Sequence, residues 1–131
     1  MFTDKNVETI KRWIEQVDAS LGCTTEVLKG AEIGTLKYSS TYHDLIRETA
    51  KKGAYERCLY ANEMKRVDAI DLVKSWAQAC EDFLEVIEDK LRSKLNISDH
   101  LSLHSSCITA RVESKVYRKC LDLVVKKGES K

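Results

Sequence analysis

Proline is absent from this chain of 131 residues, and glycine occurs only five times. These two residues are the commonest helix breakers and turn formers. Their scarcity favours helices joined by short polar loops and argues against a many-stranded sheet. A chain of this length, with 43% hydrophobic residues, can also bury a core without disulfides or metals. We therefore expect an all-α, mainly helical protein.

An excess of charge of one sign is also missing, since 22 Lys and Arg face 21 Asp and Glu. A formal net charge of +1 provides no global field toward nucleic acid or an anionic membrane, so any contact with nucleic acid must come from a local patch. The densest basic cluster is Lys51, Lys52, Arg57, Lys65 and Arg66. It could contact phosphates or simply keep this part of the chain soluble.

Long hydrophobic runs are lacking as well. No run approaches the roughly 18 apolar residues of a membrane span, and the first residues lack the pattern of a signal peptide. The five cysteines are odd in number and widely spaced, mostly among apolar helical positions, which is typical of a reducing compartment. We expect a cytoplasmic protein with no membrane partner.

Signatures of catalysis are missing too, because the chain has no nucleotide-binding loop and no metal-spaced cysteine pair. His100, His104 and Cys107 would share one helical face and could hold zinc. Their segment has the composition of a loop, however, and no second cluster accompanies it. We interpret them as surface histidines near a buried cysteine, and we expect no metal, no cofactor and no enzymatic activity.

What the chain does have is a long amphipathic pattern between residues 62 and 95, for which Asp68 is a candidate cap. Its apolar stripe should form a core or an oligomer interface, and the pattern leaves these two alternatives open. The stripe includes Val73, Trp76, Cys80, Phe83, Ile87 and Leu91. A polar connection over 96–106 and a final helix over 108–124 should follow, so the back part consists of two long amphipathic helices packed as a bundle.

Shorter elements are predicted in the front part. A first helix over 7–21 should end at Gly22, and a short helical segment over 23–30 should follow. The sequence AEIGTLKYSS, residues 31–40, is the only candidate for a small β-hairpin. A capped helix should then begin at Ser40 or Thr41. An end or a kink of that helix is expected at Gly53, where a change in organisation divides the chain into a front part, 1–53, and a helical oligomerisation or packing part, 54–131. The alternative is that both parts form one domain.

This order of front elements is that of a winged helix-turn-helix, whose second helix enters the major groove of DNA. The short helix 23–30 would then read the DNA and the hairpin would form the wing. The candidate DNA-contacting residues are Thr24, Thr25, Lys29 and Lys37.

The back part shows a family resemblance. LYANEMKRVDAIDLVKSWAQACEDFLEVIEDKLRSKL resembles the segment after the DNA-binding region of lambda-type phage terminase small subunits. The matching features are Asn62, the basic step before Asp68, the central Trp76 and the Arg and Leu residues at the end of the helix. ITARVESKVYRKCLDLV is similar to the closing helix of that family.

The resemblance implies a non-enzymatic DNA-packaging factor of viral origin. Such a factor forms homo-oligomers, marks double-stranded DNA and recruits a large terminase subunit. The alternative is a helical protein-interaction module, an adaptor or a small inhibitor, that does not bind DNA.

Overall fold

The computed structural model describes residues 2–64, 68–93 and 96–129. These residues form four α-helices and no strand, which confirms the predicted helical class. The helices are α1 (Asp4–Gly30), α2 (Leu36–Glu63), α3 (Ala69–Arg92) and α4 (Ile97–Glu129).

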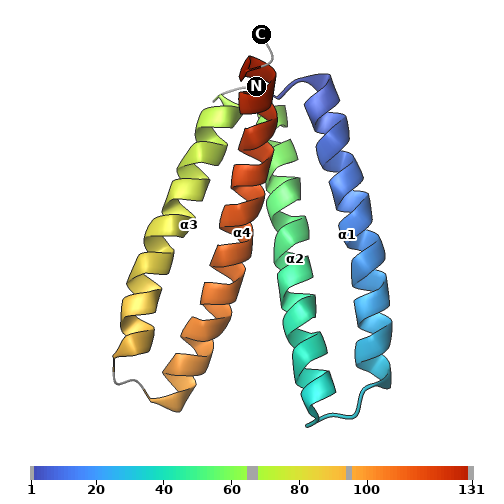
Figure 1. The fold of residues 1–131 in the computed structure, drawn as a ribbon, viewed down its shortest axis with the longest axis vertical. Coiled ribbons are helices and arrows are strands. Elements are labelled where there is room, and N and C mark those ends of the chain that lie inside the picture. The colour runs from blue at the N-terminus through green and yellow to red at the C-terminus, as the bar shows by residue number, and fades with distance from the viewer. Residues whose placement is uncertain (1, 65–67, 94–95, 130–131) are drawn as a thin grey trace.

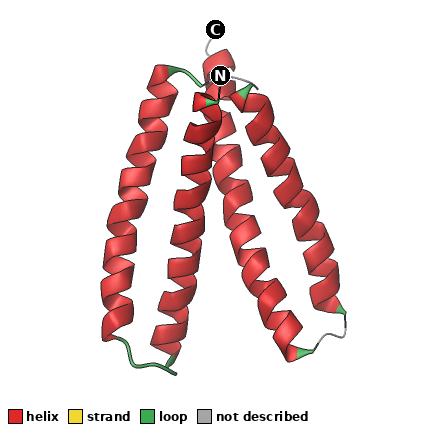
Figure 2. Ribbon diagram, turned by 180° about the vertical axis from the view of Figure 1, so that it is seen from behind, coloured by secondary structure: helices red, strands yellow, loops and turns green. Residues whose placement is uncertain are grey.

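The helices form two antiparallel hairpins, α1 with α2 and α3 with α4 (Figure 1). The hairpins are joined mainly by packing of α2 on α4, whereas α1 and α3 do not touch within the described ranges. The helices therefore follow one another in space in the order α3, α4, α2, α1. The hairpins converge at the end that holds both chain termini and splay apart toward their loops (Figures 1 and 2). We call these the closed end and the open end.

The hydrophobic core lies toward the closed end, where all four helices contribute to it. Its largest fully buried members are Tyr55, Ile10 and Val73. Near the open end, burial is confined to smaller contacts such as Ile87 of α3 and Cys107 of α4. The core cluster comprises Phe2, Ile10, Val17, Ala54, Tyr55, Cys58, Ala61, Ala69, Val73, Ala77, Val116, Tyr117, Cys120 and Leu121.

The predicted stop at Gly22 is wrong, because α1 continues without interruption to Gly30. The segment 23–30 is therefore the last two turns of α1 and not a separate helix. A glycine inside a helix costs about 1 kcal/mol relative to alanine, which packing can outweigh. Here Thr24 supplies such a contact, since its hydroxyl donates a hydrogen bond to Glu48 of α2.

The predicted β-hairpin over 31–40 is also wrong, since residues 31–35 form a loop and α2 begins at Leu36. Thr35 is the N-cap of α2, and its Oγ1 accepts a hydrogen bond from the Tyr38 N–H at 3.2 Å. An isolated two-stranded hairpin is marginal in water, whereas a capped helix here packs on α1. Consequently the described residues contain no wing.

The interruption predicted at Gly53 is not observed, because α2 runs through it to Glu63. The boundary expected between residues 53 and 54 falls inside this helix. Residues on both sides of that boundary contribute to the same core cluster, Ile10 from the front part and Val73 from the back part.

The long helix predicted after Asp68 is confirmed as α3, and Asp68 caps it by accepting from the Ile70 N–H at 2.8 Å. Leu95, at the end of the predicted stripe, lies outside the described residues. The connection predicted over 96–106 is wrong, because α4 begins at Ile97. Asn96 starts this helix, since its Oδ1 accepts from the Asp99 N–H at 2.8 Å. This first part of α4 carries no apolar stripe because the splayed open end leaves much of it exposed.

Candidate nucleic-acid interface

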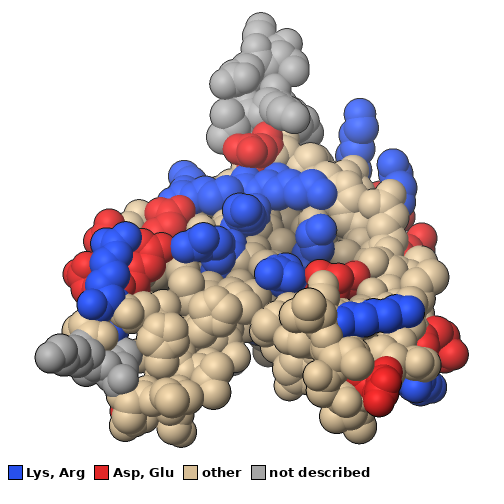
Figure 3. Space-filling view, turned by 60° about the horizontal axis from the view of Figure 1, so that its bottom comes forward, with Lys and Arg blue, Asp and Glu red and all other residues tan. Residues whose placement is uncertain are grey.

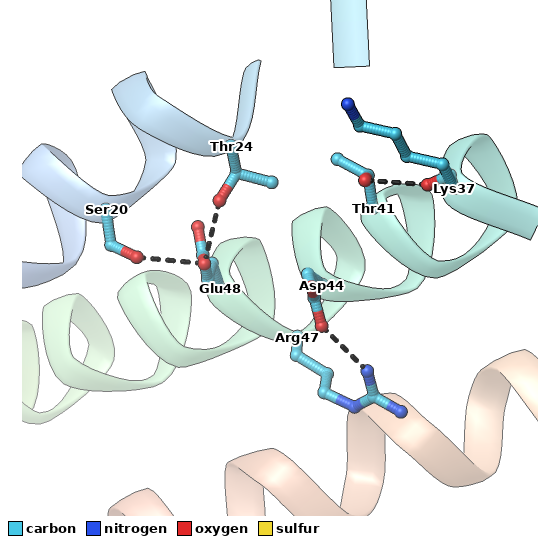
Figure 4. Close-up of polar contacts among 7 residues, drawn as sticks. All are labelled: Ser20, Thr24, Lys37, Thr41, Asp44, Arg47 and Glu48. Carbon is cyan, nitrogen blue, oxygen red and sulfur yellow. Dashed lines mark hydrogen bonds and ion pairs between the residues drawn. The ribbon is translucent and has the colours of Figure 1, made fainter. Parts of the chain in front are cut away.

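The two threonines predicted to contact DNA are engaged inside the first hairpin. Thr24 and Ser20 of α1 both point toward α2 and donate to Glu48 Oε1 at 2.9 Å (Figure 4). The Thr25 hydroxyl donates to the Leu21 carbonyl at 2.7 Å, within its own helix. Both hydroxyls thus serve helix packing and helix geometry and are not presented on a reading surface.

The two predicted lysines lie on either side of the loop at the open end. Lys29 is in the last turn of α1, where its Nζ lies 3.5 Å from Glu26 and its side chain is exposed. Lys37 is in the first turn of α2 and is exposed. The structure therefore does not gather the four predicted residues on one helix face. That Lys29 and Lys37 contact DNA stays a prediction.

A different basic surface begins on α2, where His43, Arg47 and Lys51 recur every four residues. That spacing places them on one face of the helix. Arg47 pairs with Asp44 on its own helix at 3.2 Å and extends toward α4 (Figure 4). Lys51 is exposed and has no ion-pair partner among the described residues.

The opposing helix, α4, carries a matching stripe of Arg111, Lys115 and Lys119 at the same four-residue spacing. His104 lies two turns before Arg111 on this face. Lys115 is exposed and, like Lys51, has no ion-pair partner in the part of the chain described. The two stripes face each other because α2 packs on α4.

Between the stripes runs a groove that opens as the hairpins splay. Its wide part has a volume of about 600 Å³. The floor is apolar, formed by Leu91, Ile108 and Val112, and the rim includes Arg47 and Arg92. The full lining is His43, Arg47, Glu88, Leu91, Arg92, His104, Cys107, Ile108, Arg111, Val112 and Lys115. Figure 3 shows Lys and Arg gathered across the middle of the molecule, between the two splayed hairpins.

The groove continues toward the closed end, where it narrows between α1, α2 and α4. There Lys119 Nζ lies 4.0 Å from the centre of the Trp13 ring and donates to Tyr55 Oη at 3.1 Å. Burial raises the pKa of Tyr55 to about 12, so this phenol is neutral at physiological pH. Lys119 is thereby held in place at the narrow end of the basic surface.

Two carboxylates also line this surface, and both are engaged. Glu88 accepts from Arg111 at 2.7 Å. Glu48 accepts from Ser20 and Thr24 through Oε1, while its buried Oε2 has no hydrogen-bond partner among the described residues. Arg47 is paired with Asp44, whereas no carboxylate among the described residues forms an ion pair with Lys51, Arg92, Lys115 or Lys119. The groove is thus locally positive although the whole chain is nearly neutral.

The imidazoles of His43 and His104 meet across the wide part of the groove, with ring centres 6.3 Å apart in an edge-to-face arrangement. Within the described ranges, no three side chains of His, Cys, Asp or Glu come together as a metal site would require. The histidines therefore join the two hairpins at the groove through an aromatic contact.

The stripe predicted on α3 is mostly core within the chain. Val73 and Ile87 are buried, Cys80 and Leu91 are partly buried, and Trp76 packs on Tyr117 of α4 with ring centres 5.8 Å apart. Phe83 is the exception, because 46% of its surface is exposed. It faces away from the core.

Sequence reasoning missed the groove, although one signal was present. The four-residue spacing of His43, Arg47 and Lys51 and of Arg111, Lys115 and Lys119 is visible in the chain. The basic cluster that the sequence did single out is divided by the fold. Lys52 pairs with Asp18 at 2.7 Å, Arg57 pairs with Glu113 on the opposite face, and Lys65 and Arg66 lie outside the described residues.

Comparison of the chain with family models, with curated proteins and with solved structures finds no match. Among the described residues, no helix is both long enough and apolar enough to cross a membrane.

Proposed function

We propose that this protein is a non-enzymatic factor that binds double-stranded DNA along the groove between α2 and α4. The observation that carries the proposal is the pair of basic stripes that face each other across this groove, with Arg47 and Lys51 on one side and Arg111 and Lys115 on the other. Cations that lack internal acidic partners, such as Lys51 and Lys115, are suited to bind phosphates.

The dimensions of the surface fit one phosphate backbone. From His104 to Lys119 the helix rises roughly 22 Å, and a four-residue step is about 6 Å. Phosphates of one strand follow each other every 3.4 Å or so along the duplex axis, so successive cations of a stripe would meet about every second phosphate. A duplex would lie along the groove, with the backbone of one strand between the two rims.

The mode of recognition differs from that of a winged helix, because the contacts proposed here go to the backbone and not to base edges. Backbone contacts position a protein on DNA but carry little sequence information. We therefore propose binding with low sequence selectivity.

The resemblance to terminase small subunits extends the proposal to a role in DNA packaging, in which the protein assembles on DNA and recruits a large subunit. That extension rests on the resemblance alone. The groove argument is independent of it.

A fluorescent duplex titrated with the protein over a salt series tests DNA binding. The double variant Lys51→Gln/Lys115→Gln should weaken binding at low salt and reduce the slope of log affinity against log salt by about 2, one for each lost phosphate contact. Both side chains are exposed, so the fold should be unaffected. Circular dichroism on the same sample checks that point.

The double variant Lys29→Gln/Lys37→Gln is the matched control, since it removes the same charge from exposed residues beside the loop of the first hairpin. If the groove carries the DNA contacts, and not the lysines predicted from the sequence, this control should bind like the wild type. If this control loses affinity while the groove variant does not, the DNA contacts lie beside the loop between α1 and α2. Absence of wild-type binding even at low salt would overturn the proposal and favour the protein-interaction module.

A further inference from the structure

The face opposite the basic groove is hollowed and apolar. On α4, Thr109 lies about 160° around the helix axis from Arg111 and about 120° from Lys115, because each residue turns the helix by about 100°. A hollow of about 580 Å³ lies between α4 and α3, and one of about 490 Å³ between α4 and α2. Thr109 borders both hollows, so α4 forms a shallow valley between its two neighbours.

The walls of this valley carry large exposed apolar side chains. On α3, Phe83 is 46% exposed in the wall of one hollow, and on α2 Tyr42 is 49% exposed beside Leu45 and Ile46 in the wall of the other. Val86 follows Phe83 by three residues on α3 and is 52% exposed. Aromatic and aliphatic groups left in water at a concave surface mark an interaction site more often than singly scattered residues do.

The charge on this face is balanced within the chain. The charged residues that line the two hollows are Arg57 and Glu113, and they form an ion pair with each other. Arg57 also donates to Tyr117 Oη at 2.7 Å. Such a face attracts neither a polyanion nor a basic partner. It also lacks the unpaired cations that would make the basic groove repel a copy of itself.

We propose that this neutral face binds the same face of a second copy of the chain in a two-fold dimer. The α2 ridge around Tyr42 and Ile46 of each protomer lies in the partner's valley beside Phe83, so the two contacts are equivalent by symmetry. Because α4 is lined here by small residues such as Ser106 and Ala110, it leaves room for the incoming ridge.

The size of the neutral face indicates how tightly the proposed dimer should associate. The part of α2 from Tyr42 to Arg57 rises roughly 22 Å, and the distance across α2, α4 and α3 is about 18 Å, or about 400 Å² in projection. Stable dimers bury around 800 Å² of accessible surface per partner, and a grooved face has more accessible surface than its projection. The dimer should therefore be weak and depend on concentration.

Dimerisation through this face leaves both basic grooves on the outside of the assembly. A dimer would then contact two DNA segments, or two places on one segment, and gain avidity that the monomer lacks. The dimer itself does not require DNA, so it is tested without DNA.

Sedimentation equilibrium of the wild type and two variants tests whether the neutral face forms the dimer interface. Phe83→Glu should shift the dimer dissociation constant at least roughly tenfold toward monomer, because a carboxylate would be buried in an apolar contact. Val27→Glu is the matched control, since Val27 is 45% exposed but lies on α1, away from this face. It should dimerise like the wild type. A dimer unaffected by Phe83→Glu, or one dissociated equally by Val27→Glu, would overturn the assignment.

The wild type provides an independent test through its own thiols. Cys80 lines the hollow between α3 and α4, whereas Cys23 is exposed on α1. As protein concentration rises through the dimerisation range, alkylation of Cys80 by iodoacetamide should slow while alkylation of Cys23 stays constant. A constant ratio of the two rates would exclude this face even if a variant failed to fold. A wild type that is monomeric up to roughly 1 mM would overturn the dimer altogether.

Discussion

At the scale of single residues, the contact among Trp13, Tyr55 and Lys119 links structure to the proposed binding surface. The Trp13 and Tyr55 rings lie 5.6 Å apart and join α1 to α2, while Lys119 adds α4 through its contacts with both rings. The ammonium group of Lys119 thus stabilises the packing of α1, α2 and α4 at the edge of the core, and it also extends the basic stripe of α4. A cation over an aromatic ring contributes about 0.5–1 kcal/mol at a partly exposed site.

The raised pKa of Tyr55 predicts a loss of stability at alkaline pH. In the unfolded chain a tyrosine ionises near pH 10, whereas burial in the folded protein raises the pKa of Tyr55 to about 12. Below pH 10 the phenol is neutral in both states and its contribution is fully present. Between pH 10 and about 12 only the unfolded state ionises, so the free energy of unfolding should fall.

Urea unfolding at several alkaline pH values measures this effect. Tyr55→Phe should show a shallower fall in stability over that range than the wild type. Tyr60→Phe is the control, because Tyr60 is 60% exposed and should leave the pH dependence unchanged. Identical curves for the wild type and Tyr55→Phe would contradict the assignment of the alkaline transition to Tyr55.

At the scale of elements, two glycines have opposite effects on stability, because one lies inside a helix and the other in a left-handed turn. Gly22 lies within α1, where an added Cβ would meet nothing within 4 Å. Gly34 lies in the loop before α2 and has a φ of 91°, a conformation that other residues adopt only with strain. The same residue type therefore costs stability at one position and is required at the other.

Alanine substitutions at these two glycines should act in opposite directions. Gly22→Ala should raise the free energy of unfolding by about 1 kcal/mol through helix propensity. Gly34→Ala should lower it by about 1–2 kcal/mol through the strain of a left-handed conformation. Urea denaturation of both variants measures these changes in the free energy of unfolding. If Gly22→Ala lowered it as Gly34→Ala does, α1 would be interrupted at residue 22, as the sequence predicts.

At the scale of the whole molecule, the residues that stabilise the fold and the residues of the proposed binding groove lie in different regions. The core cluster draws on all four helices toward the closed end, whereas the wide part of the groove lies where the hairpins have separated. This separation allows charged residues to face each other across the groove without being buried. It also leaves the open end dependent on the packing within each hairpin.

Amide hydrogen exchange of the wild type should therefore differ along single helices. On α2, amides of 54–61 should exchange at least roughly tenfold more slowly than those of 40–46, because burial is concentrated toward the closed end. On α4, amides of 114–121 should exchange more slowly than those of 101–106. The comparison within one helix controls for helix propensity and length. Uniform protection along α2 would show that the open end is as stable as the core.

The sequence by itself determined the helical class, the α3 helix with its Asp68 cap, and the burial of Val73 and Ile87, because these depend on periodicity and capping along the chain. Local patterns misjudged the continuity of α1 at Gly22 and of α2 at Gly53, and they suggested a hairpin where Thr35 caps a helix. In each case packing between helices, such as the Thr24 contact with Glu48, favours the continuous or capped helix.

The basic groove and the neutral face were decided only by the tertiary structure. Arg47 and Lys115 are 68 positions apart in the chain, and they line one surface because α2 and α4 pack together and then diverge. Arg57 and Lys51 are close in sequence but lie on opposite faces of α2, so the fold assigns one to an ion pair and leaves the other exposed. Periodicity can place a residue on a face of its helix, but the neighbour of that face depends on how the helices pack.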